Sequence, residues 1–238
     1  MRPDIVVGFD GSAGAESAVD WAAREAVMQG LRLRVVTAEP YVQLPYGGTG
    51  AGAVPPRGSH RADDVVEGGR SRAATVLDHT RLESAVISGY APAALVRESG
   101  HADLVVVGHR GHGRAREHVT GSVAFTVATH ASCDVVVVPP GVSVPVGPER
   151  PVVVGVDGSD DADRAARRAA QFASERGAVV ILVQAGRARS VTALVDACDG
   201  AGLLVVGSRS LGGVRRMFVG SVRAAVRRVT VPVLVVRG

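Results

Sequence analysis

The sequence predicts an α/β protein in which two tandem units each form a doubly wound, parallel sheet with helices on both faces. Three observations predict this fold. Short apolar runs alternate with helical patterns along the 238 residues. Hydrophobic residues make up 46% of the chain, mostly Val and Ala, which suits strands buried on both faces. One pattern occurs twice: 5–12 recurs as 152–159, 104–108 as 203–207, and Gly121-Ser122-Val123 as Gly220-Ser221-Val222.

Each element of the first repeat is predicted from local pattern. Residues 4–9 are an apolar run too short for a helix and are predicted as a strand. Ser12 is a candidate N-cap for a helix over about 15–29, which ends at Gly30. Residues 31–38 are predicted as the second strand. Residues 40–60 are rich in Gly and Pro and are predicted as a long loop.

The alternation continues to the end of the first repeat. The predicted helices cover 61–80, 92–99 and 121–130, and Pro92 stands near the start of the second of them. The predicted strands cover 82–88, 103–107 and 134–138, each an apolar run bounded by turn residues. Residues 139–151 hold five prolines and two glycines, which indicates a linker. We therefore expect domains at 1–140 and 151–238, with a linker at 141–150.

The second repeat is shorter than the first. Its predicted strands cover 152–156, 178–184, 202–206 and 231–236, and its predicted helices cover 160–176, 190–198 and 220–228. The offset between the copies falls from 147 (Asp10 to Asp157) to 99 (Gly108 to Gly207), so 147 − 99 = 48 residues are missing. These correspond to the long loop, second helix and third strand. A sheet survives such a loss only if strand three is an edge, which predicts the order 3-2-1-4-5.

Composition excludes several classes of function. All 27 basic residues are Arg, so neither a Walker A lysine nor a Schiff-base lysine exists. Residues 1–149 hold 13 Arg and 16 acidic residues (−3), and residues 150–238 hold 14 Arg and 7 acidic residues (+7), which together give the net +4. The basic second half suits an anionic partner. Aromatic residues are only 3%, which argues against a stacking platform for nucleic acid.

The sequence also favours one compartment. Its two cysteines, Cys133 and Cys198, occupy unrelated positions in the two repeats, which predicts free and inert thiols in a reducing compartment. No apolar run approaches the ~18 residues of a membrane span, and the chain passes directly from Met1 into a strand. We therefore expect a cytoplasmic protein with no membrane partner.

A glycine-rich pattern follows the fourth strand of the first repeat. It consists of Gly108-His109-Arg110-Gly111, nine residues, and then Gly121-Ser122. Glycines let backbone amides approach a ligand, and the N-terminus of the helix that starts here favours a phosphate. Asp10, at the end of the first strand, supplies an acceptor for ribose hydroxyls or a cation at the switch point of the sheet.

This pattern resembles that of the universal stress protein family, whose nucleotide-binding members carry Gly-x2-Gly-x9-Gly-Ser/Thr after the fourth strand. Gly108, Gly111, Gly121 and Ser122 match it, Asp10 matches the acidic residue ending strand one, and Ala38 matches the position that meets adenine. The resemblance covers nearly the whole chain. It implies two Rossmann-like (adenine nucleotide α-hydrolase-like) domains and an ATP-binding role in stress signalling, with or without Mg²⁺. Ligand-binding residues would be Asp10, Ala38, Gly108, Gly111, Gly121, Ser122 and Val123.

The resemblance also implies a contact between the repeats. Members pair through their fifth strands, so 135–138 and 233–236 are expected to meet as a pseudo-dimer within the chain, with a homodimer as a further option. The second repeat keeps Asp157, Gly207, Gly220 and Ser221 as a weaker site, but Ser210 replaces the equivalent of Gly111. A signalling protein of unknown identity would read the bound state.

Simpler interpretations remain open at each position. Asp10 suits a turn, Ser122 suits an N-cap, and the glycines suit strand ends. Arg110, Arg114 and Arg116 suit a solvated loop, as do His109 and His112, which lack the partners of a metal site. An ATP-pyrophosphatase would need Ser-Gly-Gly-x-Asp-Ser after strand one, which is absent. No catalytic residue is identified, so the alternatives are an ATP-binding switch, at most a slow ATPase, and a nucleotide-free scaffold.

Overall fold

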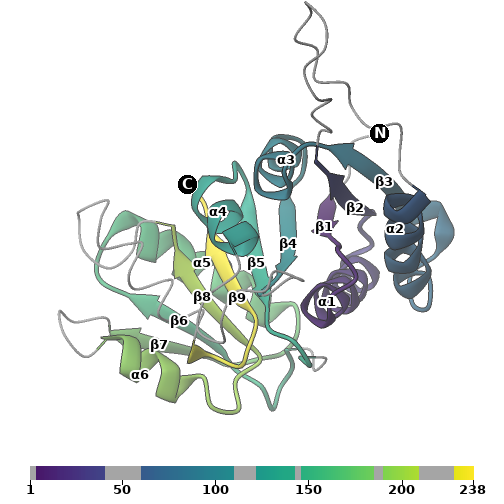
Figure 1. Cartoon of the computed structure of the whole chain (residues 1–238). Helices are drawn as coiled ribbons and strands as arrows, with labels where there is room; N and C mark the ends of the chain where they lie inside the picture. Colours follow the sequence, from purple (N-terminus) through teal and green to yellow (C-terminus); the bar gives the residue numbers. More distant parts are fainter. Residues whose placement is uncertain (1–3, 41–59, 110–121, 143–145, 185–189, 209–227) are drawn as a thin grey trace, which may run out of the picture.

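The computed structural model describes residues 4–40, 60–109, 122–142, 146–184, 190–208 and 228–238 (Figure 1). The first repeat contains, in order, β1 (Ile5–Gly8), α1 (Ala13–Gln29), β2 (Leu33–Glu39), α2 (His60–Ala73), β3 (Leu82–Ser88), α3 (Ala91–Glu98), β4 (Leu104–Gly108), α4 (Ser122–His130) and β5 (Asp134–Val138). The second contains β6 (Val152–Val156), α5 (Asp160–Ser174), β7 (Val180–Gln184), α6 (Ser190–Ala197), β8 (Leu203–Gly207) and β9 (Val233–Val236). Of the loop predicted over 40–60, residues 41–59 lie outside the described residues, as does the predicted helix over 220–228 except for Arg228 at its end.

All nine described strands form one sheet in the order β3-β2-β1-β4-β5-β9-β8-β6-β7. The first five strands confirm the predicted order 3-2-1-4-5. The second repeat contributes 5-4-1-2, so its described residues provide no counterpart of α2 or β3, as the missing 48 residues predict. Every neighbouring pair is parallel except β5 with β9.

The antiparallel pair β5–β9 joins the two repeats. Val135 lies opposite Val235, Val136 opposite Leu234, and Val137 opposite Val233. Because β5 pairs with β4 in the same register as β9 with β8, Val136 and Leu234 are equivalent residues of the two repeats. The junction is therefore symmetric about this pair. The fifth strands thus meet as the family resemblance implied.

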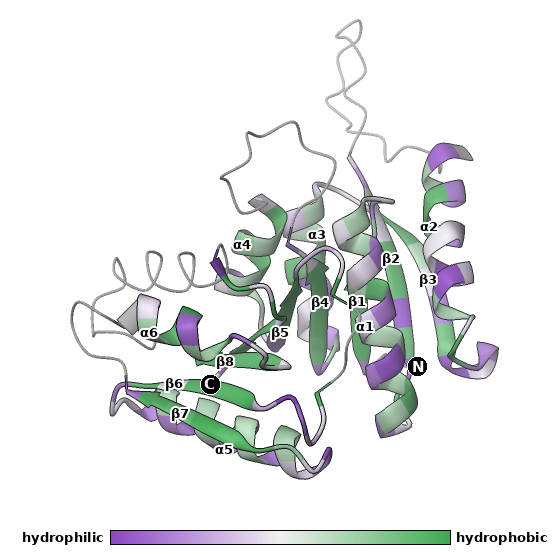
Figure 2. Cartoon of the chain, turned by 90° about the horizontal axis from the view of Figure 1, so that it is seen from below, coloured by the Kyte–Doolittle hydropathy of each residue, from purple (hydrophilic) through white to green (hydrophobic). Residues whose placement is uncertain are grey.

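The helices cover the two faces of the sheet in two layers. The helices α1, α2 and α5 pack on one face, where their apolar residues form a core with the inward side chains of the strands. The helices α3, α4 and α6 pack on the other face around a second core. The strands are therefore buried on both sides in most of the sheet, which accounts for their nearly continuous Val, Ile and Leu content (Figure 2).

One helix ends earlier than its sequence pattern predicts. The spacing predicts a helix over 61–80, but α2 ends at Ala73 and a short 3-10 turn covers His79–Arg81. Side chains offer the backbone other partners here: the Thr75 hydroxyl donates to the Arg72 carbonyl at 2.8 Å, and Asp78 accepts from the Thr80 amide at 2.7 Å. Such local bonds compete with the helical pattern and end it.

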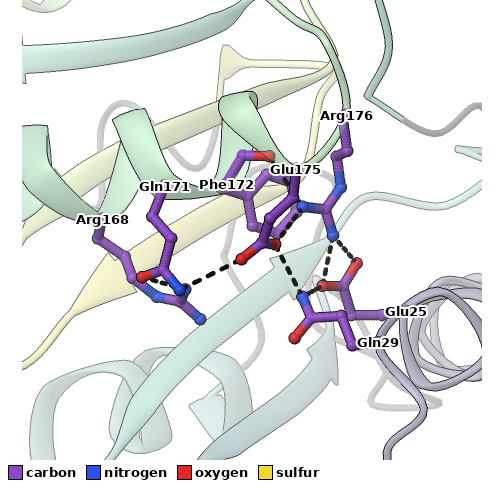
Figure 3. Close-up of polar contacts among 7 residues, drawn as sticks. All are labelled: Glu25, Gln29, Arg168, Gln171, Phe172, Glu175 and Arg176. Carbon is purple, nitrogen blue, oxygen red and sulfur yellow. Dashed lines mark hydrogen bonds and ion pairs between the residues drawn. The ribbon is translucent and has the colours of Figure 1, made fainter.

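A second contact between the repeats joins α1 to the end of α5 (Figure 3). Arg176 donates to both carboxylate oxygens of Glu25 at 2.6 Å, and both side chains are less than 8% exposed. The Arg176 guanidinium carbon lies 3.4 Å from the centroid of the Phe172 ring. That ring stacks on the ring of Trp21, with 6.5 Å between the two centroids. The Trp21 ring of α1 therefore packs across the junction of the repeats.

Burial raises the pKa of Glu25, and the nearby charge of Arg176 opposes this shift. Gln29 donates to the same carboxylate, and Arg176 also donates to Glu175 at 3.0 Å and to the Phe172 carbonyl at 2.8 Å. The pair is therefore enclosed by further polar contacts, as a buried ion pair requires.

The segment between the repeats is packed rather than solvated. The Gly141 amide donates to the Ser17 hydroxyl of α1 at 3.0 Å, and Val146 is buried beside Gly202 of the second repeat. Within the described residues, the predicted linker thus contacts both repeats.

Candidate functional site

The carboxyl ends of β1, β2 and β4 lie at one end of the sheet in the first repeat, together with the N-terminus of α4. These strands are parallel neighbours, and the chain leaves β1 toward one side of the sheet and β4 toward the other. We call this region the first switch point. In open α/β sheets ligands bind at such a position. Strands β6 and β8 form the corresponding second switch point.

Asp10 closes the turn that leads from β1 into α1. One of its carboxylate oxygens accepts from the Ser12 amide at 3.0 Å and from the Ser12 hydroxyl at 2.6 Å. Ser12 in turn accepts from the Ala15 amide at 3.2 Å and caps α1, as predicted. The turn role considered for Asp10 is therefore present. Its side chain is exposed at this end of the sheet.

Ala38 lies at the end of β2, beyond the last paired residue of β1. The Phe9 amide donates to the Val36 carbonyl at 2.8 Å, so Val36 and, by alternation, Ala38 direct their backbone groups toward the β1 side. The Phe9 carbonyl accepts from the Thr37 hydroxyl at 2.9 Å. The backbone of Ala38 therefore faces the β1 side of β2 at this end of the sheet.

Gly108 ends β4 directly against the first turn of α1. A Cβ at this position would lie 2.5 Å from the Gly14 carbonyl carbon and 2.7 Å from the Ala15 amide nitrogen. Only glycine fits such a contact with backbone atoms. Gly108 thus brings the start of α1 close to β4, a packing role that the sequence interpretation of this residue as a strand end or ligand contact did not include.

Ser122 and Val123 begin α4, the helix that starts at this end of the sheet. Ser122 is exposed, whereas the Val123 side chain is half-buried against the core on that face. For Val123 only the backbone amide is suited to a ligand, because it belongs to the first turn of the helix. Gly111, Gly121, Arg110, Arg114, Arg116 and His112 lie outside the described residues.

His109 was expected in a solvated loop, and the structure corrects this. Its side chain is only 6% exposed, and its amide donates to the Val138 carbonyl at 2.8 Å, so β4 continues one residue alongside β5. The equivalent residue of the second repeat, Ser208, is also buried and donates to the Val236 carbonyl at 2.9 Å. Both switch points therefore begin with a buried polar residue after the strand glycine.

The second switch point repeats the turn of the first. Asp157 accepts from the Ser159 amide at 3.1 Å and from its hydroxyl at 2.6 Å, and Ser159 caps α5 by accepting from the Ala162 amide at 3.2 Å. Gly207 ends β8, as Gly108 ends β4. Gly220, Ser221 and Ser210 lie outside the described residues.

One difference between the switch points was not noticed in the sequence. By the offset of 147 residues, Asp161 of α5 takes the position of Gly14 in α1. Asp161 is only 6% exposed; one of its oxygens pairs with Arg164, and the other has no hydrogen-bond partner among the described residues. A buried carboxylate therefore stands where the first repeat presents only backbone. Aligning the repeats by their offset would have revealed the substitution, although not its burial.

Neither cysteine is suited to act as a nucleophile. Burial raises the pKa of both Cys133 and Cys198 to about 12, which disfavours thiolate formation near neutral pH and agrees with the expectation of inert thiols.

Among the described residues, no group of three or more His, Cys, Asp or Glu side chains is arranged to hold a metal ion. None of the described helices is long and apolar enough to span a membrane.

Comparison with known proteins identifies relatives of both repeats. The model of the universal stress protein family matches residues 1–139 and 149–199. A universal stress protein from Archaeoglobus fulgidus DSM 4304 has the same fold, with a TM-score of 0.66 and 16% identity over 100% of this chain and 99% of its own. A functionally unknown protein from Pseudomonas aeruginosa PAO1 also has this fold, with a TM-score of 0.65. It is 11% identical over 99% of this chain and 92% of its own.

A single-repeat structure is also similar. The universal stress protein from Archaeoglobus fulgidus solved in complex with dAMP is 25% identical over 58% of this chain and 97% of its own, with a TM-score of 0.40. No curated protein matches the chain.

Proposed function

The chain belongs to the universal stress protein family, and from this premise we propose that it is an ATP-binding regulatory protein of the stress response. In this proposal the nucleotide binds mainly at the first switch point and acts as a ligand-dependent switch. The observation that carries the proposal is the gathering of Asp10, the Ala38 backbone, Gly108 and the start of α4 at one end of the sheet.

The described residues fit an adenine nucleotide in their chemistry. Ala38 supplies backbone donor and acceptor groups for the edge of a base, and Asp10 supplies a carboxylate for ribose hydroxyls. The N-terminus of α4, with the Ser122 hydroxyl and the Val123 amide, suits a phosphate because unpaired amides and the helix dipole favour an anion. Gly111 and Gly121 complete the proposed set on the basis of the sequence pattern.

The proposed role is binding rather than turnover. The chain has no lysine to place on the phosphates. Near the first switch point, Asp10 already accepts two hydrogen bonds from Ser12. A carboxylate held in this way is suited to orienting a ligand. Hydrolysis is therefore at most slow, and the useful output is the difference between the bound and free surfaces, which a signalling partner reads.

The second repeat is proposed as a weaker site or none. Its turn at Asp157 is equivalent to that at Asp10, but the buried Asp161 carboxylate adds a negative charge close to where phosphates would lie. A like charge disfavours a triphosphate. Ser210 in place of glycine adds a side chain to the predicted loop. Gly207, Gly220 and Ser221 remain compatible with an anion, which is why the site is proposed as weakened.

Calorimetric titration of the full chain with ATP, with and without Mg²⁺, tests the proposal. We expect one strong binding event per chain. Gly111→Arg should abolish it, because the side chain fills the proposed phosphate position. Ser210→Arg is the matched control, since residue 210 is the equivalent position in the second repeat, and it should leave the strong event unchanged.

Two results would contradict the proposal. The first is the absence of both binding heat and thermal shift at millimolar ATP, which would favour the alternative of a nucleotide-free scaffold. The second is equal affinity in the Gly111→Arg variant and the parent protein, which would place the nucleotide elsewhere. Mass spectrometry of nucleotide retained through purification identifies the natural ligand independently.

A further inference from the structure

The two edges of the nine-stranded sheet differ in their protection. At one edge β3 carries the exposed Glu83, and α2 packs over β2 and β3. At the other edge β7 is short, and residues 177–186 (Gly-Ala-Val-Val-Ile-Leu-Val-Gln-Ala-Gly) carry no charge. Proteins commonly protect exposed edges with charged residues, proline or a covering element. Over the described residues, β7 has none of these.

The exposure of β7 follows from the missing 48 residues. By the offset of 147, Leu182 is equivalent to Val35 of β2, which is fully buried under α2. That helix packs so closely that a Cβ on Gly69 would lie 2.9 Å from Val35 Cγ1. Leu182, with no such helix among the described residues, is 62% exposed. The second repeat has therefore kept the apolar strand and lost its cover.

Exposed apolar side chains gather on this edge. The described residues include seven large hydrophobic side chains that are exposed, and three of them, Val179, Ile181 and Leu182, lie within four consecutive positions. Figure 2 shows β7 at the outer edge of the sheet, coloured as hydrophobic over most of its length. Because successive side chains of a strand point to opposite faces, Val179 and Ile181 lie on one side of this edge and Leu182 on the other, so the edge is apolar on both faces.

The backbone of β7 offers a second element of recognition. The Val152 amide donates to the Val179 carbonyl at 2.8 Å, so by alternation Val179, Ile181 and Val183 direct their backbone groups toward β6. Val180, Leu182 and Gln184 direct theirs outward. In the first repeat the equivalent outward groups of β2 pair with β3 from Leu33 to Glu39. The outward groups of β7 thus form a template for one more strand.

We propose that β7 is the interface through which two copies of this chain associate, by antiparallel pairing of β7 with β7 across a twofold axis. Two features favour a second copy over another occupant. The uncharged run is complementary to itself, because a twofold pairing sets no like charges opposite one another. The chain also already contains a junction of the same chemistry, since β5 and β9 are apolar strands paired antiparallel and symmetrically.

The register of the pair follows from the outward groups. Centring the pair on Leu182 places Leu182 opposite its copy and Val180 opposite Gln184, so all three outward residues exchange hydrogen bonds, about six in total. The exposed Leu182 side chains then lie on the same face, next to each other. Pairing of β7 with β3 of another copy would instead build an open chain of copies, because each added copy leaves a new edge free. The charge of Glu83 at the β3 edge opposes this pairing.

Sedimentation velocity of the full chain from about 1 to 100 µM tests the proposal. We expect a closed dimer that becomes monomeric in Leu182→Glu, with at least a tenfold increase in the dissociation constant, because two carboxylates meet on the axis. Met28→Glu is the matched control: Met28 is exposed at 51% on α1, and this variant should remain dimeric. Circular dichroism and thermal unfolding confirm that both variants fold.

Cross-linking through Leu182→Cys tests the register directly. A short bis-maleimide should join two copies of this variant rapidly, whereas Met28→Cys should not cross-link. The native thiols contribute little background, because burial raises their pKa to about 12. A protein that is monomeric at 100 µM overturns the proposal. So does a dimer that Leu182→Glu leaves unchanged, or an open series of oligomers. None of these outcomes depends on nucleotide, so the result is separate from that of the ATP titration.

Discussion

The two repeats share the turn at the end of their first strand but differ in what surrounds it. Asp10 with Ser12 and Asp157 with Ser159 make the same hydrogen bonds within about 0.1 Å. Beside this turn, the first repeat presents the backbone of Gly14, and the second buries the carboxylate of Asp161. The Asp-Gly-Ser turn is therefore a structural device of the fold. Binding of a nucleotide must be decided by the residues around it.

The repeats also differ in their outer cover. In the first, α2 and β3 enclose β2, and in the second the equivalent strand β7 remains at the edge. The core itself is little affected, because the lost strand is the outermost one and β6, β8 and β9 stay fully buried at most positions. Shortening the second repeat has thus exposed β7 and left the other strands of that repeat buried.

The largest expected effect concerns the contact that holds the repeats together. Glu25→Ala leaves Arg176 buried without its main partner, which should destabilise the protein by about 3–5 kcal/mol. Chemical denaturation measures this loss. Arg70→Ala removes an exposed pair with Glu67 in the first repeat alone, and it should cost less than about 1 kcal/mol. Equal costs for the two variants would mean that the repeats do not depend on their shared pair.

The next effect distinguishes packing from binding at the first switch point. Gly108→Ala places a Cβ within 2.5 Å of α1 backbone, which should destabilise the fold by about 1–3 kcal/mol even without ligand. Thermal unfolding of the ligand-free protein measures it. At Gly100, where an added Cβ meets nothing within 4 Å, the same substitution should change stability by less than about 0.5 kcal/mol. If Gly108→Ala were neutral, the glycine would serve the ligand alone.

A third prediction converts the second repeat toward the first. The double variant Asp161→Gly, Ser210→Gly removes a buried negative charge and restores the glycine of the first repeat. We expect nucleotide affinity at the second switch point to rise by about tenfold or more, equivalent to about 1.4 kcal/mol. Calorimetry in the Gly111→Arg background isolates this event. A double variant that binds no better than the single Gly111→Arg protein would show that other residues weaken the second site.

The smallest effect tests what the repeats have in common. Ser12→Ala and Ser159→Ala each remove a helix cap and should each cost about 1 kcal/mol. Thr at either position keeps the hydroxyl and serves as the control. Urea denaturation of both variants should give the same loss within error. A clear difference between them would contradict the equivalence of the two turns.

Much of the fold was predictable because it rests on local pattern and on the repeat. The caps at Ser12 and Ser159 follow from short-range hydrogen bonding, and the strand order follows from which segment the second repeat can lose. The end of α2 was not predictable from periodicity, since the hydroxyl of Thr75 and the carboxylate of Asp78 end the helix within an otherwise suitable pattern.

Contacts between distant residues were beyond the sequence analysis. Glu25 and Arg176 are 151 positions apart, and nothing in their local surroundings indicates that they meet. The burial of His109 depends in the same way on β5 lying beside β4, which a loop-like sequence does not reveal. The candidate site falls between these cases: its residue types were visible in the sequence, whereas the packing role of Gly108 and the position of Asp161 required the fold.

The antiparallel junction of β5 and β9 has a consequence for the two candidate sites. Because it reverses the direction of every strand in the second repeat, the two switch points point away from each other, at opposite ends of the molecule. A partner docked over one leaves the other accessible, and no ligand bound at one can touch a ligand bound at the other. The two switch points therefore face opposite directions, and any coupling between them must pass through the shared sheet.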